Sequence, residues 1–173
     1  MKPAAEHRLA GHGLAVALPA RWEGRLYRRT VGQPGATLHA QATGTGTGWP
    51  GELSHPVLHL ANFALPASRG DYGTGAVELM GPDNLFVALL EFGPDCLGTA
   101  LYSPRGLPRV TPGQFNPNGM QRRIAGQAGL QHFFTQGNRP FCLYVVIGSH
   151  RQAVALAKQA NEVLERIEVE HAG

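Results

Sequence analysis

Arginine side chains are the residues whose type and spacing most clearly point to binding chemistry. Between Cys96 and Asn161 the chain has seven basic residues and no acidic one. Guanidinium groups form bidentate hydrogen bonds with carboxylate and phosphate groups. We therefore consider a binding surface for a protein partner or a small anionic ligand. Its candidate residues are Arg105, Arg109, Arg122, Arg123 and Arg139.

Charge is distributed unevenly along the chain. The segment 53–95 has five acidic residues and one basic residue, in contrast to the basic segment 96–161. Two such segments can neutralise each other within one fold, or they can meet between subunits as complementary surfaces. Nucleic acid is not expected as a partner, because the net charge is only +3 and no nucleic-acid-binding motif is present.

Histidine is abundant, and His55 and His59 have the spacing of a metal-binding pair on a helix. Pro56 and the run VLHLANFAL instead favour a strand, in which side chains four residues apart lie about 13 Å apart. We therefore predict no metal site. His132 could serve as an acid or base beside Arg122, Arg123 and Arg139 if the ligand is an anionic substrate, but a half-buried position between Leu130 and Phe134 also explains it.

Nucleophilic and carboxylate chemistry find little support. Cys142 lies in the apolar run PFCLYVVIG and is expected in the core, and neither cysteine has a C-x-x-C context. Ser149 precedes a helical pattern and is expected to cap it, with Gln152 completing a capping box. Glu78 and Glu91 could face each other across a hairpin, but surface positions explain them equally well. We predict no catalytic residue and no cofactor.

The pattern of apolar residues predicts mainly strands. The candidate strands end in turns that are rich in glycine, proline and asparagine. The pair Gly137-Asn138 suggests a type II′ hairpin turn. An apolar stripe at helical spacing follows Ser149, and the tail IEVE suggests a last short strand. The predicted strands are Leu14–Leu18, Gly24–Thr30, Thr37–Thr43, Val57–Leu65, Ala76–Met80, Leu85–Phe92, Ala100–Ser103, Gly129–Gln136 and Pro140–Gly148.

Three stretches are predicted to be irregular within a single domain spanning 1–173. They are a flexible segment at 1–12, a glycine-rich loop at 43–52 and a proline-rich loop at 104–119. Large apolar residues in such loops are candidate partner contacts, because they expose apolar area. The candidates are Trp49, Leu107, Phe115 and Met120.

These elements predict an α+β fold, a mainly antiparallel sheet with a C-terminal amphipathic helix packed on it. The opening strand followed by L-P-x-x-W (Leu18, Pro19, Trp22), together with the closing strand, helix and short strand, resembles PsbP-like α/β-sandwich proteins. The middle of the chain, RGDYGTGAVELMGPDNLFVALLE, together with FCLYVVIGSH, also resembles a family of actinobacterial proteins without an assigned activity. The PsbP-like resemblance implies a non-enzymatic accessory or binding protein.

Composition is that of a globular domain, with 43% hydrophobic and 16% charged residues. No apolar run approaches the roughly 18 residues of a membrane span, and the first residues have no secretory apolar region. We therefore expect a cytoplasmic protein with reduced cysteines and no membrane contact. The expected function is a protein-interaction or assembly module that self-associates or binds a protein partner. The alternative is a binder of, or enzyme acting on, a small anionic ligand held by the arginines.

Overall fold

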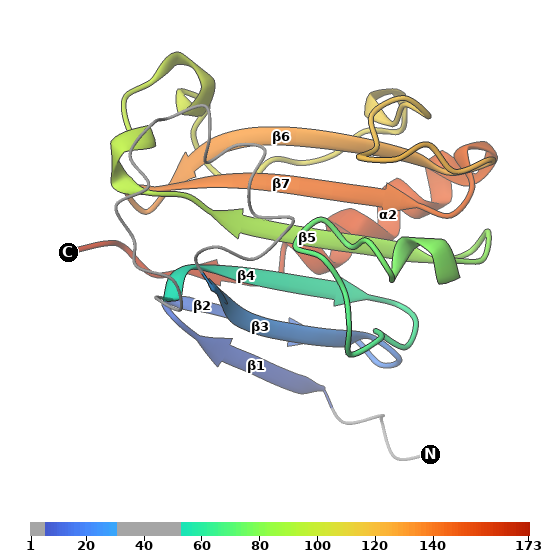
Figure 1. Cartoon of the computed structure of the whole chain (residues 1–173), viewed down its shortest axis with the longest axis horizontal. Coiled ribbons are helices and arrows are strands. Elements are labelled where there is room, and N and C mark those ends of the chain that lie inside the picture. The colour runs from blue at the N-terminus through green and yellow to red at the C-terminus, as the bar shows by residue number, and fades with distance from the viewer. Residues whose placement is uncertain (1–5, 31–52) are drawn as a thin grey trace.

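The computed structural model describes residues 6–30 and 53–173, which form an α+β fold of two antiparallel sheets and a C-terminal α-helix (Figure 1). This confirms the predicted fold class. The expected strand Thr37–Thr43, the glycine-rich loop and Trp49 lie outside the described residues. No helix in the described part of the chain combines the length and apolar character that crossing a bilayer requires.

The larger sheet has five strands in the order β3-β4-β5-β7-β6, so β3 and β6 are its edges (Figure 1). Its strands are β3 (Glu23–Thr30), β4 (Leu53–Ala61), β5 (Leu85–Glu91), β7 (Arg139–Ile147) and β6 (Ala128–Gln136). The smaller sheet consists of β1 (His7–Gly11), β2 (Leu14–Leu18) and β8 (Ile167–Val169). Strand β1, expected within a flexible segment, pairs along its full length with β2.

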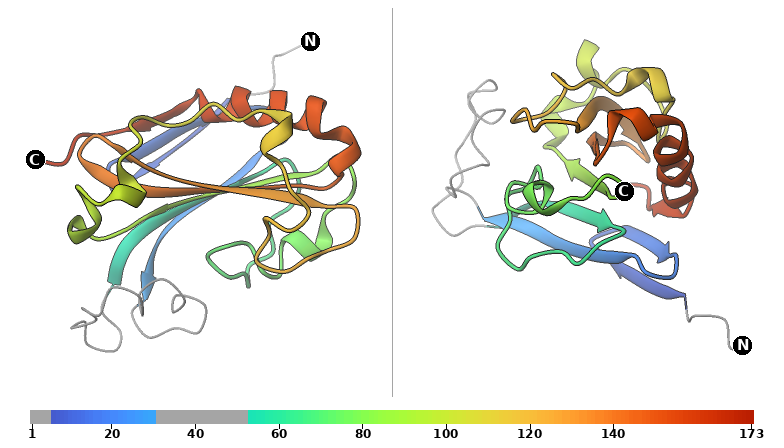
Figure 2. Two further views of the ribbon diagram at one scale, coloured as in Figure 1. Left: turned by 90° about the horizontal axis from the view of Figure 1, so that it is seen from above. Right: turned by 90° about the vertical axis from the view of Figure 1, so that its right-hand side faces the viewer.

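The central strand β5 and its neighbour β7 have no exposed residue. Helix α2 (Ala153–Leu164) and the smaller sheet lie on the same side of the larger sheet, as Figure 2 shows. Leu65, Val77 and Met120, from connecting segments, pack on the opposite side. The prediction that Phe141–Ile147 is covered on both faces is confirmed.

The apolar stripe of α2 is confirmed, because its buried side chains include those at 153, 156, 157, 160, 163 and 164. The predicted capping box is wrong. The Ser149 side chain makes no capping hydrogen bond; its carbonyl accepts from Gln152 N–H at 3.1 Å. A 3₁₀ turn, η5 (His150–Gln152), therefore precedes α2 and takes the place of a side-chain cap.

Four local predictions differ from the structure. The strand expected at Val57–Leu65 is β4, which begins and ends four residues earlier. The segment expected to be the first strand of a hairpin contains a 3₁₀ helix, η1 (Val77–Leu79), in which Leu79 N–H donates to Ala76 O and Met80 N–H donates to Val77 O. The turn at Gly137 and Asn138 is type I′ rather than II′, since both residues have positive φ. The strand expected at Ala100–Ser103 is also a 3₁₀ helix, η3 (Ala100–Tyr102). The remaining 3₁₀ helices outside the helix start at η5 are η2 (Pro94–Cys96) and η4 (Pro112–Gln114).

Candidate binding groove at the β6 edge

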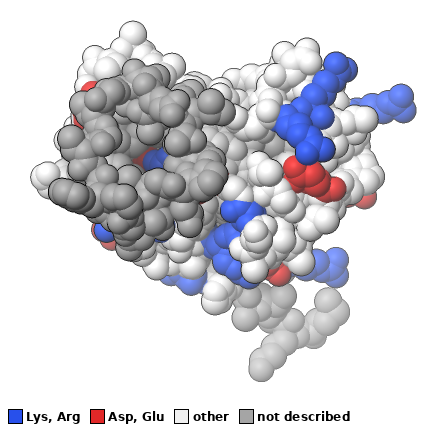
Figure 3. Space-filling model, in the orientation of Figure 1, with Lys and Arg blue, Asp and Glu red and all other residues white. Residues whose placement is uncertain are grey.

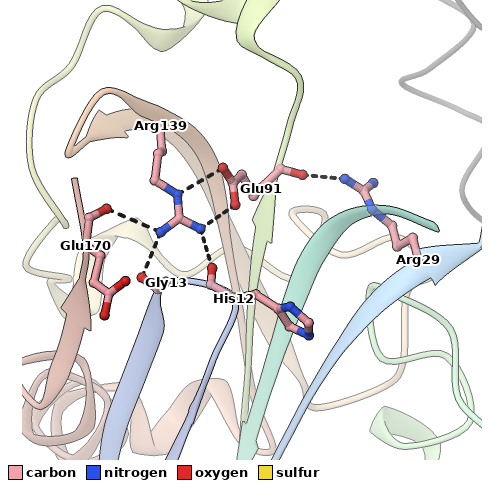
Figure 4. Close-up of polar contacts among 6 residues, drawn as sticks. All are labelled: His12, Gly13, Arg29, Glu91, Arg139 and Glu170. Carbon is pink, nitrogen blue, oxygen red and sulfur yellow. Dashed lines mark hydrogen bonds and ion pairs between the residues drawn. The ribbon is translucent and has the colours of Figure 1, made fainter. Parts of the chain in front are cut away.

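Arg139 is buried at the start of β7 and uses all five of its N–H donors within the protein (Figure 4). Its Nε and Nη2 groups donate to the two carboxylate oxygens of Glu91 at 3.0 and 2.6 Å. Its remaining donors reach the carbonyl oxygens of His12, Gly13 and Glu170 at 2.8, 2.7 and 3.3 Å. No donor of Arg139 is left for a ligand, so this candidate residue joins β5 and β7 to the β1–β2 turn and the C-terminal segment.

The other four candidate arginines do not form one site. Arg105 lies beside Thr135, at the end of β6, whereas Arg122 and Arg123 follow Gly119, which packs on Gly129 near the start of β6. Six strand residues span about 20 Å. Figure 3 shows one face of the molecule, on which the Lys and Arg side chains stand in separate groups with Asp or Glu side chains beside some of them.

Arg109 and Phe115 are held by the region that the sequence predicted to be a long loop. The exposed Arg109 side chain pairs with Glu165 at 2.6 Å. Phe115 is 3% exposed and belongs to the core, so it is not available as a partner contact. Val110 exchanges two hydrogen bonds of 2.8 Å with the buried side chain of Asn161 on α2. The 104–119 segment is therefore anchored to the helix.

His59 is a structural histidine rather than a metal ligand. It is fully buried in β4; its Nδ1 accepts from Arg69 Nε at 2.8 Å and its Nε2 lies 2.7 Å from the carbonyl oxygen of Asp71. These contacts require a neutral ring with its proton on Nε2, and burial lowers the pKa of His59 to about 4. Burial also lowers the pKa of His55. The described residues contain no group of three or more side chains able to hold a metal ion.

The other side chains considered for catalysis have structural surroundings. Glu78 accepts a hydrogen bond of 2.6 Å from Gly75 N–H, and Glu91 is committed to Arg139, so the two carboxylates do not face each other across a hairpin. Cys142 is fully buried, as predicted, and burial raises the pKa of its thiol to about 12. A thiol with this pKa stays protonated near neutral pH and is a poor nucleophile.

A groove of about 560 Å³ lies at the outer edge of the first half of β6, where residues 129–132 line it. Five of its ten lining residues carry a carboxamide, and none is Asp, Glu, Lys or Arg. The carboxamides belong to Gln114, Asn116, Asn118, Gln121 and Gln131. His132 also lines the groove, and its ring stacks on Phe134 with centroids 6.1 Å apart. The groove is thus polar and formally uncharged.

Hydrogen bonds at the two ends of β6 show which backbone groups face the groove. Gly129 exchanges two bonds of 3.0 Å with Asn116, and Thr135 bonds to Pro104 O at 2.8 Å and Gly106 N at 2.9 Å. Both residues therefore direct their N–H and C=O groups away from β7. In an antiparallel pair this direction alternates along the strand, so Gln131 has the same orientation.

Gln131 thus presents a backbone donor and acceptor to the groove. These two groups make no hydrogen bond within the part of the chain that the structure describes. Its side chain is held nearby, with Nε2 3.4 Å from the Cys142 sulfur. Two unpaired backbone groups on an edge strand are a template for the addition of another strand.

The sequence predicted both the strand at 129–136 and the irregular segment before it, but not their relation. That β6 is an edge depends on strand order, which no local pattern encodes. The closely spaced amides of Gln114, Asn116, Asn118 and Gln121 were the available signal. No model of a known protein family, no curated protein and no solved structure matches the chain.

Proposed function

We propose that the protein is a non-enzymatic interaction module that binds a short extended segment of a partner protein at the edge of β6. The observation that carries the proposal is the outward-facing N–H and C=O of Gln131 within a groove. An extended peptide can bond to both groups and continue the sheet, which is the binding mode called β-augmentation.

The length of the bound segment is limited by contacts at the two ends of β6 and by the groove, which residues 129–132 of β6 line. Asn116 and the Pro104–Gly106 segment already occupy the neighbouring-strand position beside Gly129 and Thr135. These contacts are about 20 Å apart. A second copy of β6 would need the space that they occupy, so the proposed ligand is a peptide segment of about four residues rather than another β6 strand.

The lining indicates which side chains the groove accepts. Carboxamides both donate and accept hydrogen bonds, and they do so without charge. Uncharged polar residues such as Ser, Thr, Asn and Gln match this lining best. An anionic ligand held by the arginines receives less support, because none of the five candidate arginines lines the groove and Arg139 has no free donor.

The proposal can be tested with fluorescein-labelled, capped octapeptides whose central four positions are randomised. One library draws these positions from uncharged residues and a second includes Asp, Glu, Lys and Arg. Fluorescence polarisation then ranks the binding. We expect saturable binding that is concentrated in the uncharged library.

The variant Gln131→Pro removes the outward N–H but no bond to β7, and proline is tolerated at such an edge position. Gln131→Ala is its matched control, since it keeps the N–H and loses the side chain. One lost hydrogen bond is worth about 1 kcal/mol. We expect Q131P to bind the best peptide about fivefold more weakly than Q131A, with similar thermal stability. Equal affinity of the two variants, or no binding in either library, would overturn the proposal.

A further inference from the structure

A second concave site lies where the turn between β2 and β3 meets helix α2. Its volume is about 410 Å³, within the range of small-ligand sites. The turn contributes Pro19 and Trp22, and the helix with its C-terminal end contributes Gln159, Glu162, Glu165 and Arg166. This site is separate from the β6 groove and shares no residue with it.

The turn that presents Trp22 is strained. Trp22 N–H donates to Pro19 O at 3.1 Å, and Arg21 between them has φ 69°, in the left-handed region. For a residue with a Cβ this conformation costs about 1 kcal/mol or more. Trp22 is half-buried: it packs against the core and also lines the pocket. The strained turn thus places an indole, rather than a small polar side chain, on the pocket wall.

The charges on the residues that line the pocket do not balance. Glu165 pairs with Arg109 at 2.6 Å, and Arg166 reaches Glu6 at 2.9 Å. Glu162 makes no ion pair with any described residue, although Lys158 and Arg166 each lie one helical turn away. The residues that line the pocket carry two carboxylates, those of Glu162 and Glu165, and one guanidinium group, that of Arg166, which gives the lining a formal charge of −1.

We propose that this pocket binds a monovalent organic ammonium group, packed against the indole of Trp22 and paired with the carboxylate of Glu162. Tryptophan is the best aromatic partner for a cation, and an adjacent carboxylate adds an ionic contact. A single positive charge neutralises the site. The same chemistry could come from a free quaternary amine or from a lysine side chain of a partner protein.

Tryptophan fluorescence provides a direct test, because the chain has only two tryptophans. In the variant Trp49→Phe all tryptophan emission comes from Trp22. We would titrate this variant with tetramethylammonium chloride against sodium chloride of equal ionic strength. We expect a saturable change of Trp22 emission with tetramethylammonium alone. A response that is linear or identical for both salts would overturn the proposal.

Glu162 is exposed, so Glu162→Gln in the same background should weaken binding by about two- to fivefold, the size expected for a solvent-exposed ion pair. Glu168→Gln is the matched control: Glu168 is exposed, pairs with Arg8 and lies outside the pocket. Equal weakening by both changes would contradict the assigned role of Glu162. If Trp49→Phe does not fold, the indole N–H signal of Trp22 in the NMR spectrum of the wild-type chain, assigned by its loss in Trp22→Phe, gives the same readout.

Two further probes separate the sources of the ammonium group. Choline represents a free quaternary amine, and N-acetyl-lysine methylamide represents a protein side chain. Saturation by choline alone supports a small-molecule ligand, and saturation by the lysine derivative supports a basic segment of a partner. If neither these probes nor tetramethylammonium bind, the site is not an ammonium pocket.

Discussion

Replacing Arg139 by methionine tests whether this side chain, which pairs with Glu91 within the larger sheet, also holds the smaller sheet in place through its bonds to His12, Gly13 and Glu170. The change keeps much of the apolar stem and removes all five N–H donors. It leaves the Glu91 carboxylate, 11% exposed, without its partner, and three carbonyl oxygens without their donor. Breaking a buried pair from one side costs about 3–5 kcal/mol. That is a large part of the 5–15 kcal/mol by which domains are stable.

The loss would be measured by urea unfolding followed by circular dichroism. A matched control is Arg109→Met, which breaks an exposed pair with Glu165 and should change the unfolding free energy little. The double variant Arg139→Met, Glu91→Leu removes both charges from the interior. It should be more stable than the sum of the two single losses predicts, because it leaves no unpaired buried charge.

Amide hydrogen exchange would show which strands the side chain of Arg139 stabilises. The carbonyl oxygens of His12 and Gly13 lie in the β1–β2 turn, and that of Glu170 follows β8. In Arg139→Met the amides of the smaller sheet should exchange faster than those of β5 and β7. A loss below about 1 kcal/mol, or strictly additive single losses, would refute the reasoning that this pair is a closed and buried unit.

Two other changes probe the core. His59 has a pKa of about 4 in the folded chain against 6.5 ordinarily, so the unfolded chain binds a proton first as the pH falls. The neutral ring of His59 contributes fully to the free energy of unfolding above pH 6.5, and this contribution declines by about 3 kcal/mol towards pH 4. The unfolding free energy measured across this pH range should therefore fall less steeply in His59→Gln than in the wild-type chain. Leu156→Ala, at a side chain 1% exposed on α2, should cost about 2–5 kcal/mol in urea unfolding, whereas the exposed Val154→Ala on the same helix should cost little.

Local periodicity was sufficient to predict the apolar stripe of α2, the strand Leu14–Leu18 and the hairpin of β6 and β7. Each of these depends on neighbouring residues that share one face of an element. The 3₁₀ helix at Val77–Leu79 escaped prediction because its cause is the backbone path at Gly73 and Gly75, both with positive φ. An apolar run alone does not distinguish that path from a strand.

The role of Arg139 could not be predicted for a different reason. Its ion-pair partner, Glu91, is 48 residues away, and its other acceptors are backbone carbonyls at both ends of the chain. In the sequence Arg139 looks the same as Arg105 or Arg122. Among the described residues, Glu91–Arg139 is also the one ion pair that joins the acidic segment 53–95 to the basic segment 96–161. Neutralisation within the fold therefore involves this pair, not the two segments as a whole.

Hydrogen-bond saturation, rather than residue type, separates structural from candidate binding groups in this protein. Arg139 is charged and looked like a ligand-binding residue, yet every donor is used internally. Gln131 carries no charge, yet its backbone faces a groove with a donor and an acceptor unused. If Arg139 gave up its ion pair with Glu91 to bind an anion, the Glu91 carboxylate would remain unpaired in the interior. Adding a peptide to Gln131 breaks no bond within the fold, which is why the β6 edge is the better candidate site.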